Sequence, residues 1–223
     1  ERLLGEIQTP YFLLFAADDC LLPTFLESSQ RMLTRHPEAA LCSAMCFSTS
    51  ISGQRLRIWP SPVPSWSAQY FTPAEVKKKL MTFGGWFLGN TTVFNFERFT
   101  GEGGLPTCLD TLADGFISHV LALQFGACFI PSPLVEWRLS SDSASTNALT
   151  NSTRNEDIQA NLRIMANSPK FHDIFPPEYV ATWIRRRQFW LRLARANELR
   201  PEPQEFASSE LVKLNSGNIK RAT

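Results

Sequence analysis

An apolar run near the start of the chain leads directly into two adjacent carboxylates. Residues 11–15 (YFLLF) have the length and composition of a strand buried on both faces, and Asp18 and Asp19 follow it. Neighbouring negative charges that are partly desolvated need a cation or hydrogen-bond donors to stay ionised. Because ligands bind beyond the carboxyl ends of strands in open α/β sheets, this pair is a candidate ligand site. The alternative is a turn followed by a helix N-cap, since Asp is common at both places.

Helical and strand-like patterns alternate after this pair. The predicted elements are helices over residues 24–36, 73–81 and 116–125, strands over residues 39–47, 55–59 and 91–94, and a strand that follows Gly126. Gly84, Gly85 and Gly89 precede the strand over residues 91–94 and allow close backbone approach or unusual dihedral angles. The alternation predicts a mixed α/β fold.

Two polar residues belong to the helix over residues 116–125. Asp114 lies just before it and can serve as its N-cap. His119 lies off the apolar face of the helix. We expect this histidine to be exposed, or buried with its hydrogen bonds satisfied, rather than catalytic.

The composition changes towards the C-terminus. Residues 146–155 are rich in Asn, Ser and Thr, as a linker would be, and helical patterns follow over residues 156–167 and 177–199. We therefore divide the chain into a core over residues 1–145 and a linker with a helical extension over residues 146–223.

An arginine cluster, Arg185-Arg186-Arg187, lies within the last of these helices. Such a cluster can bind phosphates or make peripheral contact with an anionic membrane surface. More often it forms the solvated side of an amphipathic helix, which is the interpretation that we favour.

Composition and charge exclude several classes of protein. With 43% hydrophobic and 19% charged residues, the chain of 223 residues is globular rather than disordered. Its 22 basic and 21 acidic residues give a net charge of +1, so we expect no nucleic-acid partner. No apolar run approaches the roughly 20 residues of a membrane helix, and no signal-peptide pattern is present. We expect a soluble domain in the cytoplasm, with its five cysteines reduced.

The order of the motifs over residues 10–145 resembles that of family 2-like glycosyltransferases with the GT-A fold. In those enzymes an Asp-x-Asp-type motif closes a buried strand, and an acidic residue opens a helix after a Gly-Gly turn. The matching positions in this chain are Ala16-Ala17-Asp18-Asp19, His36-Pro37-Glu38-Ala39, Gly89-Asn90, Gly103-Gly104, Asp114, Gly126 and Trp137-Arg138. The resemblance implies a partial GT-A-like mixed sheet flanked by helices, with a C-terminal helical extension.

The resemblance further implies transfer of a sugar from a nucleotide-sugar donor to the hydroxyl of a glycan or other acceptor, with inversion. Asp114 is then the catalytic base, because a fixed carboxylate within hydrogen-bond reach can take the proton of the attacking hydroxyl. Asp18 and Asp19 hold a divalent metal, Mn²⁺ or Mg²⁺, that neutralises the leaving diphosphate. Arg138 contacts the diphosphate through its guanidinium, or else forms a surface salt bridge. We expect Asp114 and the acidic pair to face each other across a common cleft.

Departures from the family pattern keep other hypotheses open. Ala16 replaces the first acidic residue of the motif, Ala113 stands where the family often has Glu, and residues 139–145 lack the His that helps to hold the metal in family members. No complete nucleotide-binding βαβ unit fits before residue 11, so we expect the N-terminal half that contacts the nucleobase to be missing. The second hypothesis is a non-catalytic binding or assembly module that retains the GT-A-like fold. A retaining transferase or a nucleotidyltransferase of related fold is a third.

Overall fold

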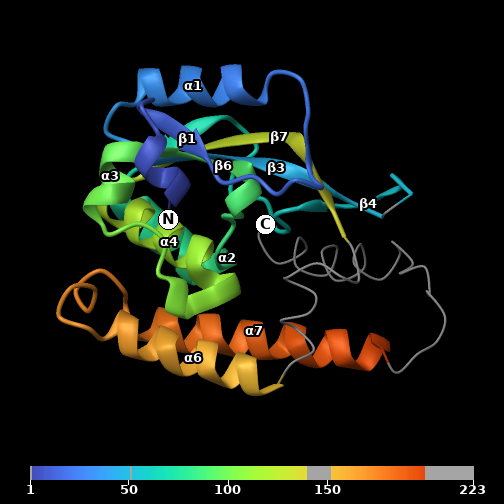
Figure 1. Cartoon of the computed structure of the whole chain (residues 1–223), viewed down its shortest axis with the longest axis vertical. Helices are drawn as coiled ribbons and strands as arrows, with labels where there is room; N and C mark the ends of the chain where they lie inside the picture. The colour runs from blue at the N-terminus through green and yellow to red at the C-terminus, as the bar shows by residue number, and fades with distance from the viewer. Residues whose placement is uncertain (1, 51, 140–151, 199–223) are drawn as a thin grey trace, which may run out of the picture.

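The chain folds around a mixed β-sheet (Figure 1). The computed structural model describes residues 2–50, 52–139 and 152–198, and the sheet has seven strands within these ranges. Its order is β1 (Tyr11–Leu13), β6 (Thr92–Asn95), β3 (Leu41–Thr49), β7 (Ala127–Arg138) and β2 (Cys20–Leu21), with β4 (Arg55–Trp59) beside β3 and β5 (Gln69–Phe71) beside β7. β3 and β7 run parallel to each other, whereas the other strand pairs of the described sheet are antiparallel.

Helices cover the sheet on both faces, and two more form an outer layer (Figure 1). Within the described ranges the helices are α1 (Phe25–Arg35), α2 (Pro73–Phe83), α3 (Phe96–Gly101), α4 (Ala113–Phe125), α6 (Ser152–Ala166) and α7 (Pro177–Glu198), with 3-10 turns at η1 (Arg2–Glu6), η2 (Gly89–Thr91) and η3 (Thr107–Leu112). α1 packs on one face of the sheet against β3 and β7. α4 packs on the other face together with α2 and α3, and α6 and α7 lie beyond it.

The local sequence explains where these helices begin and which side they bury. α1 buries Phe25 and Leu33 on one side, as its helical spacing predicts. α2 begins at a capping box, in which the side chains of Thr72 and Glu75 each accept a hydrogen bond from the backbone N–H of the other. α4 is buried around most of its circumference, as expected for a helix between a sheet and an outer layer.

The predicted order of elements is confirmed, but the predicted burial of the first strand is wrong. β1 is partly exposed because it pairs with β6 alone, at an edge of the described sheet. A strand is buried on both faces when its neighbours and covering helices enclose it on every side. The predicted C-terminal helices are present, whereas the boundary between residues 145 and 146 lies outside the described residues.

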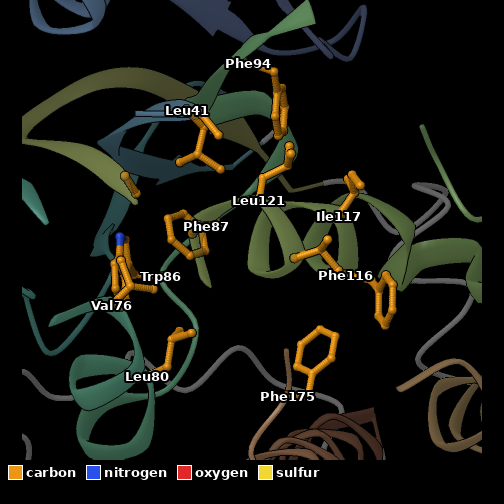
Figure 2. Packing of buried hydrophobic residues seen from close by; sticks show 14 of the residues in the cluster. Leu41, Val76, Leu80, Trp86, Phe87, Phe94, Phe116, Ile117, Leu121 and Phe175 are labelled. Carbon is orange, nitrogen blue, oxygen red and sulfur yellow. The ribbon is translucent and has the colours of Figure 1, made fainter. Parts of the chain in front are cut away.

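The outer helices share a hydrophobic core with α4 (Figure 2). Phe175, between α6 and α7, faces Phe116 of α4 with a distance of 5.2 Å between ring centroids. Leu162 and Tyr179 are almost fully buried in the same cluster, which also includes Leu41 of the central strand β3. Because the apolar contacts are continuous from the sheet to the outer layer, we expect these parts to unfold together.

Phe175→Ala is expected to lower the free energy of unfolding by about 3–5 kcal/mol, because it removes a buried ring between α4 and the outer layer. Urea denaturation followed by circular dichroism and by tryptophan fluorescence should show one shared transition at lower urea concentration. Ile164→Ala is the matched control, since Ile164 on α6 is 68% exposed and its truncation should cost about 0.5 kcal/mol or less. Separate transitions for the two signals would contradict a single core.

Candidate functional site

Asp19 lies in the turn between β1 and β2, where two hydrogen bonds fix its carboxylate. Its Oδ2 accepts a hydrogen bond from Asn90 Nδ2 at 2.7 Å, and its Oδ1 accepts one from the backbone N–H of Arg138 at 2.9 Å. The interpretation of this residue as a helix cap is wrong, because Thr24 is the N-cap of α1, and the Thr24 side chain makes no capping hydrogen bond. The donors to Asp19 come instead from the end of β7 and from the η2 turn.

Asp114 lies in the first turn of α4, and its carboxylate points to the same η2 turn. Asp114 Oδ2 accepts a hydrogen bond from the backbone N–H of Gly89 at 2.9 Å, and Oδ1 accepts one from Gly115 N–H at 2.7 Å. The N-cap of α4 is Leu112, so the N-cap interpretation of Asp114 is also wrong. A Cβ on Gly89 would lie 2.5 Å from Asp114 Oδ2, which explains why glycine is needed here.

The consecutive residues Gly89 and Asn90 therefore connect the two carboxylates. Gly89 binds Asp114 through its backbone, and Asn90 binds Asp19 through its side chain. The resemblance implies that the Gly-Asn motif belongs to the floor of the acceptor and sugar pocket, but it gives Asn90 no hydrogen-bond partner. Its partner could not be inferred, because Asp19 lies 71 residues away along the chain.

Asp18 and the side chain of Arg138 lie on the surface beside this cluster. Both residues are exposed, and Arg138 contributes its backbone N–H, rather than its guanidinium, to Asp19. Two depressions of the described surface, one beside β1 and one beside Gly103, are lined by neither Asp19 nor Asp114. The observed connection between the carboxylates is thus the Gly89–Asn90 turn, rather than one of these hollows.

Burial raises the pKa of both hydrogen-bonded carboxyl groups above the ordinary Asp value. At Asp114 desolvation is the main cause, and the N–H groups of Gly115 and Gly89 offset part of the rise in pKa. At Asp19 desolvation is again the main cause of the raised pKa, and the donors on Asn90 and Arg138 offset part of it. A carboxyl group with a raised pKa binds a proton more readily than an exposed one, which suits a group that must accept a proton.

The donor set at the acidic pair fits one mode of metal binding. Within the described ranges no group of three or more His, Cys, Asp or Glu side chains is placed to hold a metal ion. Asp18 and Asp19 supply two carboxylates, and each oxygen of Asp19 retains a lone pair beside its one hydrogen bond. Mg²⁺ is commonly held by one or two carboxylates together with substrate phosphates and water. The pair therefore fits a cation whose coordination is completed by a phosphate group, not by protein alone.

Comparison with known proteins identifies the fold. No protein-family profile matches the chain, and no curated protein matches it in sequence. The crystal structure of S. aureus TarS 1–349 in complex with UDP-GlcNAc matches with a TM-score of 0.56 and 11% identity, over 91% of this chain and 55% of that one. A second crystal structure of TarS 1–349 matches with a TM-score of 0.54 and 11% identity, over 91% of this chain and 53% of that one.

TarS is a GT-A-like glycosyltransferase. The present chain has a partial GT-A-like fold. It spans about half the length of TarS 1–349, and the low identity means that the likeness concerns the fold alone. The fold predicted from the order of the motifs is confirmed.

A buried histidine lies one turn beyond Asp114 in this GT-A-like domain. His119 Nε2 accepts a hydrogen bond from Tyr179 on α7 at 2.8 Å, and Nδ1 contacts the carbonyl oxygen of Gly115. The ring of Trp183 lies 4.4 Å from the imidazole, between centroids. Of the two predicted alternatives, an exposed histidine or a buried one with its hydrogen bonds satisfied, the structure shows the second.

Acid is expected to destabilise the GT-A-like domain through His119. Burial lowers the pKa of His119 to about 4 from an ordinary value of 6.5, so between these pH values the unfolded chain binds the proton more readily. Its contribution to stability is complete above about pH 6.5 and is lost as the pH falls towards 4, by about 3 kcal/mol. Urea denaturation at a series of pH values measures this loss.

Two variants separate this effect from other acid effects. His119→Phe should be less stable at pH 7, because Tyr179 loses its acceptor, yet its stability should fall less between pH 6.5 and 4. His172→Gln changes an exposed histidine and should follow the wild-type pH dependence. Equal pH dependence in wild type and His119→Phe would contradict the assignment.

Two arginines of the cluster Arg185-Arg186-Arg187 contact other parts of the domain, although the sequence pattern predicts that the cluster faces solvent. Arg185 is exposed, but Arg187 is partly buried, donates to Asn155 Oδ1 at 2.8 Å, and has its pKa lowered by burial. Arg186 packs over Gly84, where a Cβ would lie 3.1 Å from the guanidinium carbon. The interpretation of all three as one solvated side is wrong, because Arg186 and Arg187 face the rest of the domain.

Among the described helices, none combines the length and apolar character that crossing a membrane requires.

Proposed function

We propose that this GT-A-like domain transfers a sugar from a nucleotide-sugar donor to an acceptor hydroxyl, with inversion of the anomeric carbon. The observation that carries the proposal is the Gly89–Asn90 turn, which holds a candidate base, Asp114, and a candidate diphosphate-side carboxylate, Asp19, at one place. A protein of similar fold, TarS 1–349, was crystallised with UDP-GlcNAc, which makes this donor the first to test.

Asp114 would act as the general base. In an inverting displacement the acceptor oxygen forms a bond to the anomeric carbon as the bond to the diphosphate oxygen breaks. The hydroxyl proton moves to one of the two carboxylate oxygens of Asp114. Each of these oxygens accepts one hydrogen bond from a backbone N–H and keeps a further lone pair for the proton. The backbone donors also fix the orientation of the carboxylate, so that it does not have to be ordered during the reaction.

Asp18, Asp19 and Arg138 would act on the leaving group. When bound, a divalent cation, Mn²⁺ or Mg²⁺, would neutralise the negative charge that develops on the leaving diphosphate. Asp18 and Asp19 would hold this cation, and Asn90 and the backbone of Arg138 keep Asp19 in one orientation. The exposed guanidinium of Arg138 can pair with phosphate oxygens.

The second candidate function is a non-catalytic binding or assembly module with the same fold. It is favoured by Ala16 and Ala113, which replace acidic residues of the family pattern. A module of this kind could keep the Asp19 and Asp114 contacts for stability alone. Metal-dependent donor binding separates the two candidates.

Calorimetric titration of UDP-GlcNAc into the protein, with and without MnCl₂, tests the proposal. We expect binding that depends on Mn²⁺, and Asp19→Asn should weaken it by about tenfold or more, because one carboxylate ligand is lost. Asp173→Asn is the matched control, since Asp173 is an exposed residue between α6 and α7, away from the η2 turn. The absence of Mn²⁺-dependent binding for UDP-GlcNAc and other nucleotide sugars would favour the module.

A further inference from the structure

The Asn90 side chain and the end of β7 fix Asp19 from two directions. Asn90 Nδ2 reaches one carboxylate oxygen at 2.7 Å, and the backbone N–H of Arg138 reaches the other at 2.9 Å. An ionised carboxylate only accepts hydrogen bonds, so the amide must present its NH₂ group to Asp19. With a donor on each oxygen, the carboxylate cannot rotate without losing a charge-assisted hydrogen bond.

The backbone that carries Asn90 is itself fixed. The hydroxyl groups of Thr91 and Thr92 both donate to the carbonyl oxygen of Leu88, at 3.1 and 2.7 Å, and both threonines are buried. On the other side of Asn90, the N–H of Gly89 is bound to Asp114. A rigid turn therefore presents one donor to each carboxylate, so that a shift of this turn would move both contacts.

We propose that Asn90 is a positioning residue that holds the Asp19 carboxylate in one orientation and in fixed register with Asp114. This inference rests on the proposed function, and the ligand class concerned is a nucleoside diphosphate bound with a divalent cation. Asn90 touches neither the acceptor nor the anomeric carbon in this role. By fixing Asp19 relative to Asp114, Asn90 ensures that both carboxylates act on the same nucleotide-sugar molecule.

A reciprocal exchange of the two residues of the pair distinguishes a positioning role of Asn90 from a role in the stability of the turn alone. In the double variant Asp19→Asn with Asn90→Asp, one amide still donates to one carboxylate, and position 19 still offers an oxygen to Arg138 N–H. The hydrogen bonds of the turn are thus retained while the charge moves to the other residue of the pair. Stability should recover in this variant, whereas cation-dependent binding should not.

The experiment compares UDP binding, with and without MnCl₂, and thermal denaturation across a set of variants. Asn90→Ala should weaken Mn²⁺-dependent UDP binding about tenfold, because Asp19 loses its orientation. Asn95→Ala is the matched control: Asn95 caps α3 by accepting a hydrogen bond from Arg98 N–H at 3.0 Å, so its loss lowers thermal stability without reaching Asp19. The reciprocal exchange should restore the melting temperature lost in Asn90→Ala and leave UDP binding weak.

Two results would overturn the positioning role. One is UDP binding by Asn90→Ala that equals that of wild type or of Asn95→Ala. The other is a reciprocal exchange that restores both stability and binding, which would show that only the hydrogen bond matters.

Failure of the proposed function would look different. In that case the wild-type protein itself would not bind UDP with Mn²⁺. The inference would then be judged on the ligand-free protein, by a double-mutant cycle with Asp19→Ala and Asn90→Ala in urea denaturation. Additive effects of the two changes would overturn it, whereas a clear coupling would support the link between Asn90 and Asp19.

Discussion

Asp114→Asn is expected to abolish sugar transfer while leaving the affinity for UDP-GlcNAc nearly unchanged. The amide is similar in size to the carboxylate and can keep one of the two N–H contacts with Gly89 and Gly115, but it cannot take the proton of the acceptor. Loss of a positioned general base typically lowers the rate by about 10²–10⁴-fold. Release of UDP from UDP-GlcNAc in the presence of acceptor measures the rate, and calorimetry measures donor affinity.

The pH dependence of the wild-type rate gives a second test of Asp114. The base acts in its ionised form, and burial raises its pKa, so the rate should fall with acid at a higher pH than an exposed Asp would give. Asp110→Asn is the matched control, because Asp110 lies one turn earlier and is paired with Arg154 on the surface. Transfer by Asp114→Asn at the wild-type rate would exclude Asp114 as the base.

Gly89→Ala is expected to damage both the site and the fold. Its Cβ would lie 2.5 Å from Asp114 Oδ2 and 3.2 Å from Asp114 Cβ, so either the carboxylate or the turn must move. Overpacking of this kind costs about 1–3 kcal/mol of stability. It should also remove the N–H contact of Asp114, and with it most of the transfer activity. Urea denaturation and UDP release measure the two effects.

Gly101→Ala is the control for this change. Gly101 ends α3, and among the described residues no atom beyond its chain neighbours and the local helix backbone lies within 4 Å of a Cβ built on it. The same added methyl group should therefore leave transfer unchanged and have little effect on stability, or raise it slightly. Wild-type activity in Gly89→Ala would show that the contact between Gly89 and Asp114 is dispensable.

Much of the fold could be predicted because its signals are local. The amphipathic spacing that gives α1 and the capping residues that open α2 each lie within a few residues of one another. The candidate residues Asp19 and Asp114 could also be identified from the sequence, since each sits at the end or the start of a recognisable element. The burial of β1 could not be predicted in this way, because it depends on which strands lie beside β1 in the sheet.

The contacts that join the candidate site could not be predicted from the chain alone. Asn90 meets Asp19 across 71 residues, and Gly89 meets Asp114 across 25, and neither spacing has a periodicity that local patterns reveal. Arg187 was misinterpreted for a similar reason. Its partner Asn155 lies on α6, so a solvated and a paired arginine look identical in the sequence of α7.

The parallel pairing of β3 with β7 has a consequence for how this protein is made. Leu41 pairs with Ala127, and the hydrogen bond from Arg138 to Asp19 joins residues 119 positions apart. Contacts of such long sequence separation require a large loop to close and slow the folding reaction. During synthesis on the ribosome, the Asp19 carboxylate therefore lacks one of its two donors until β7 has emerged.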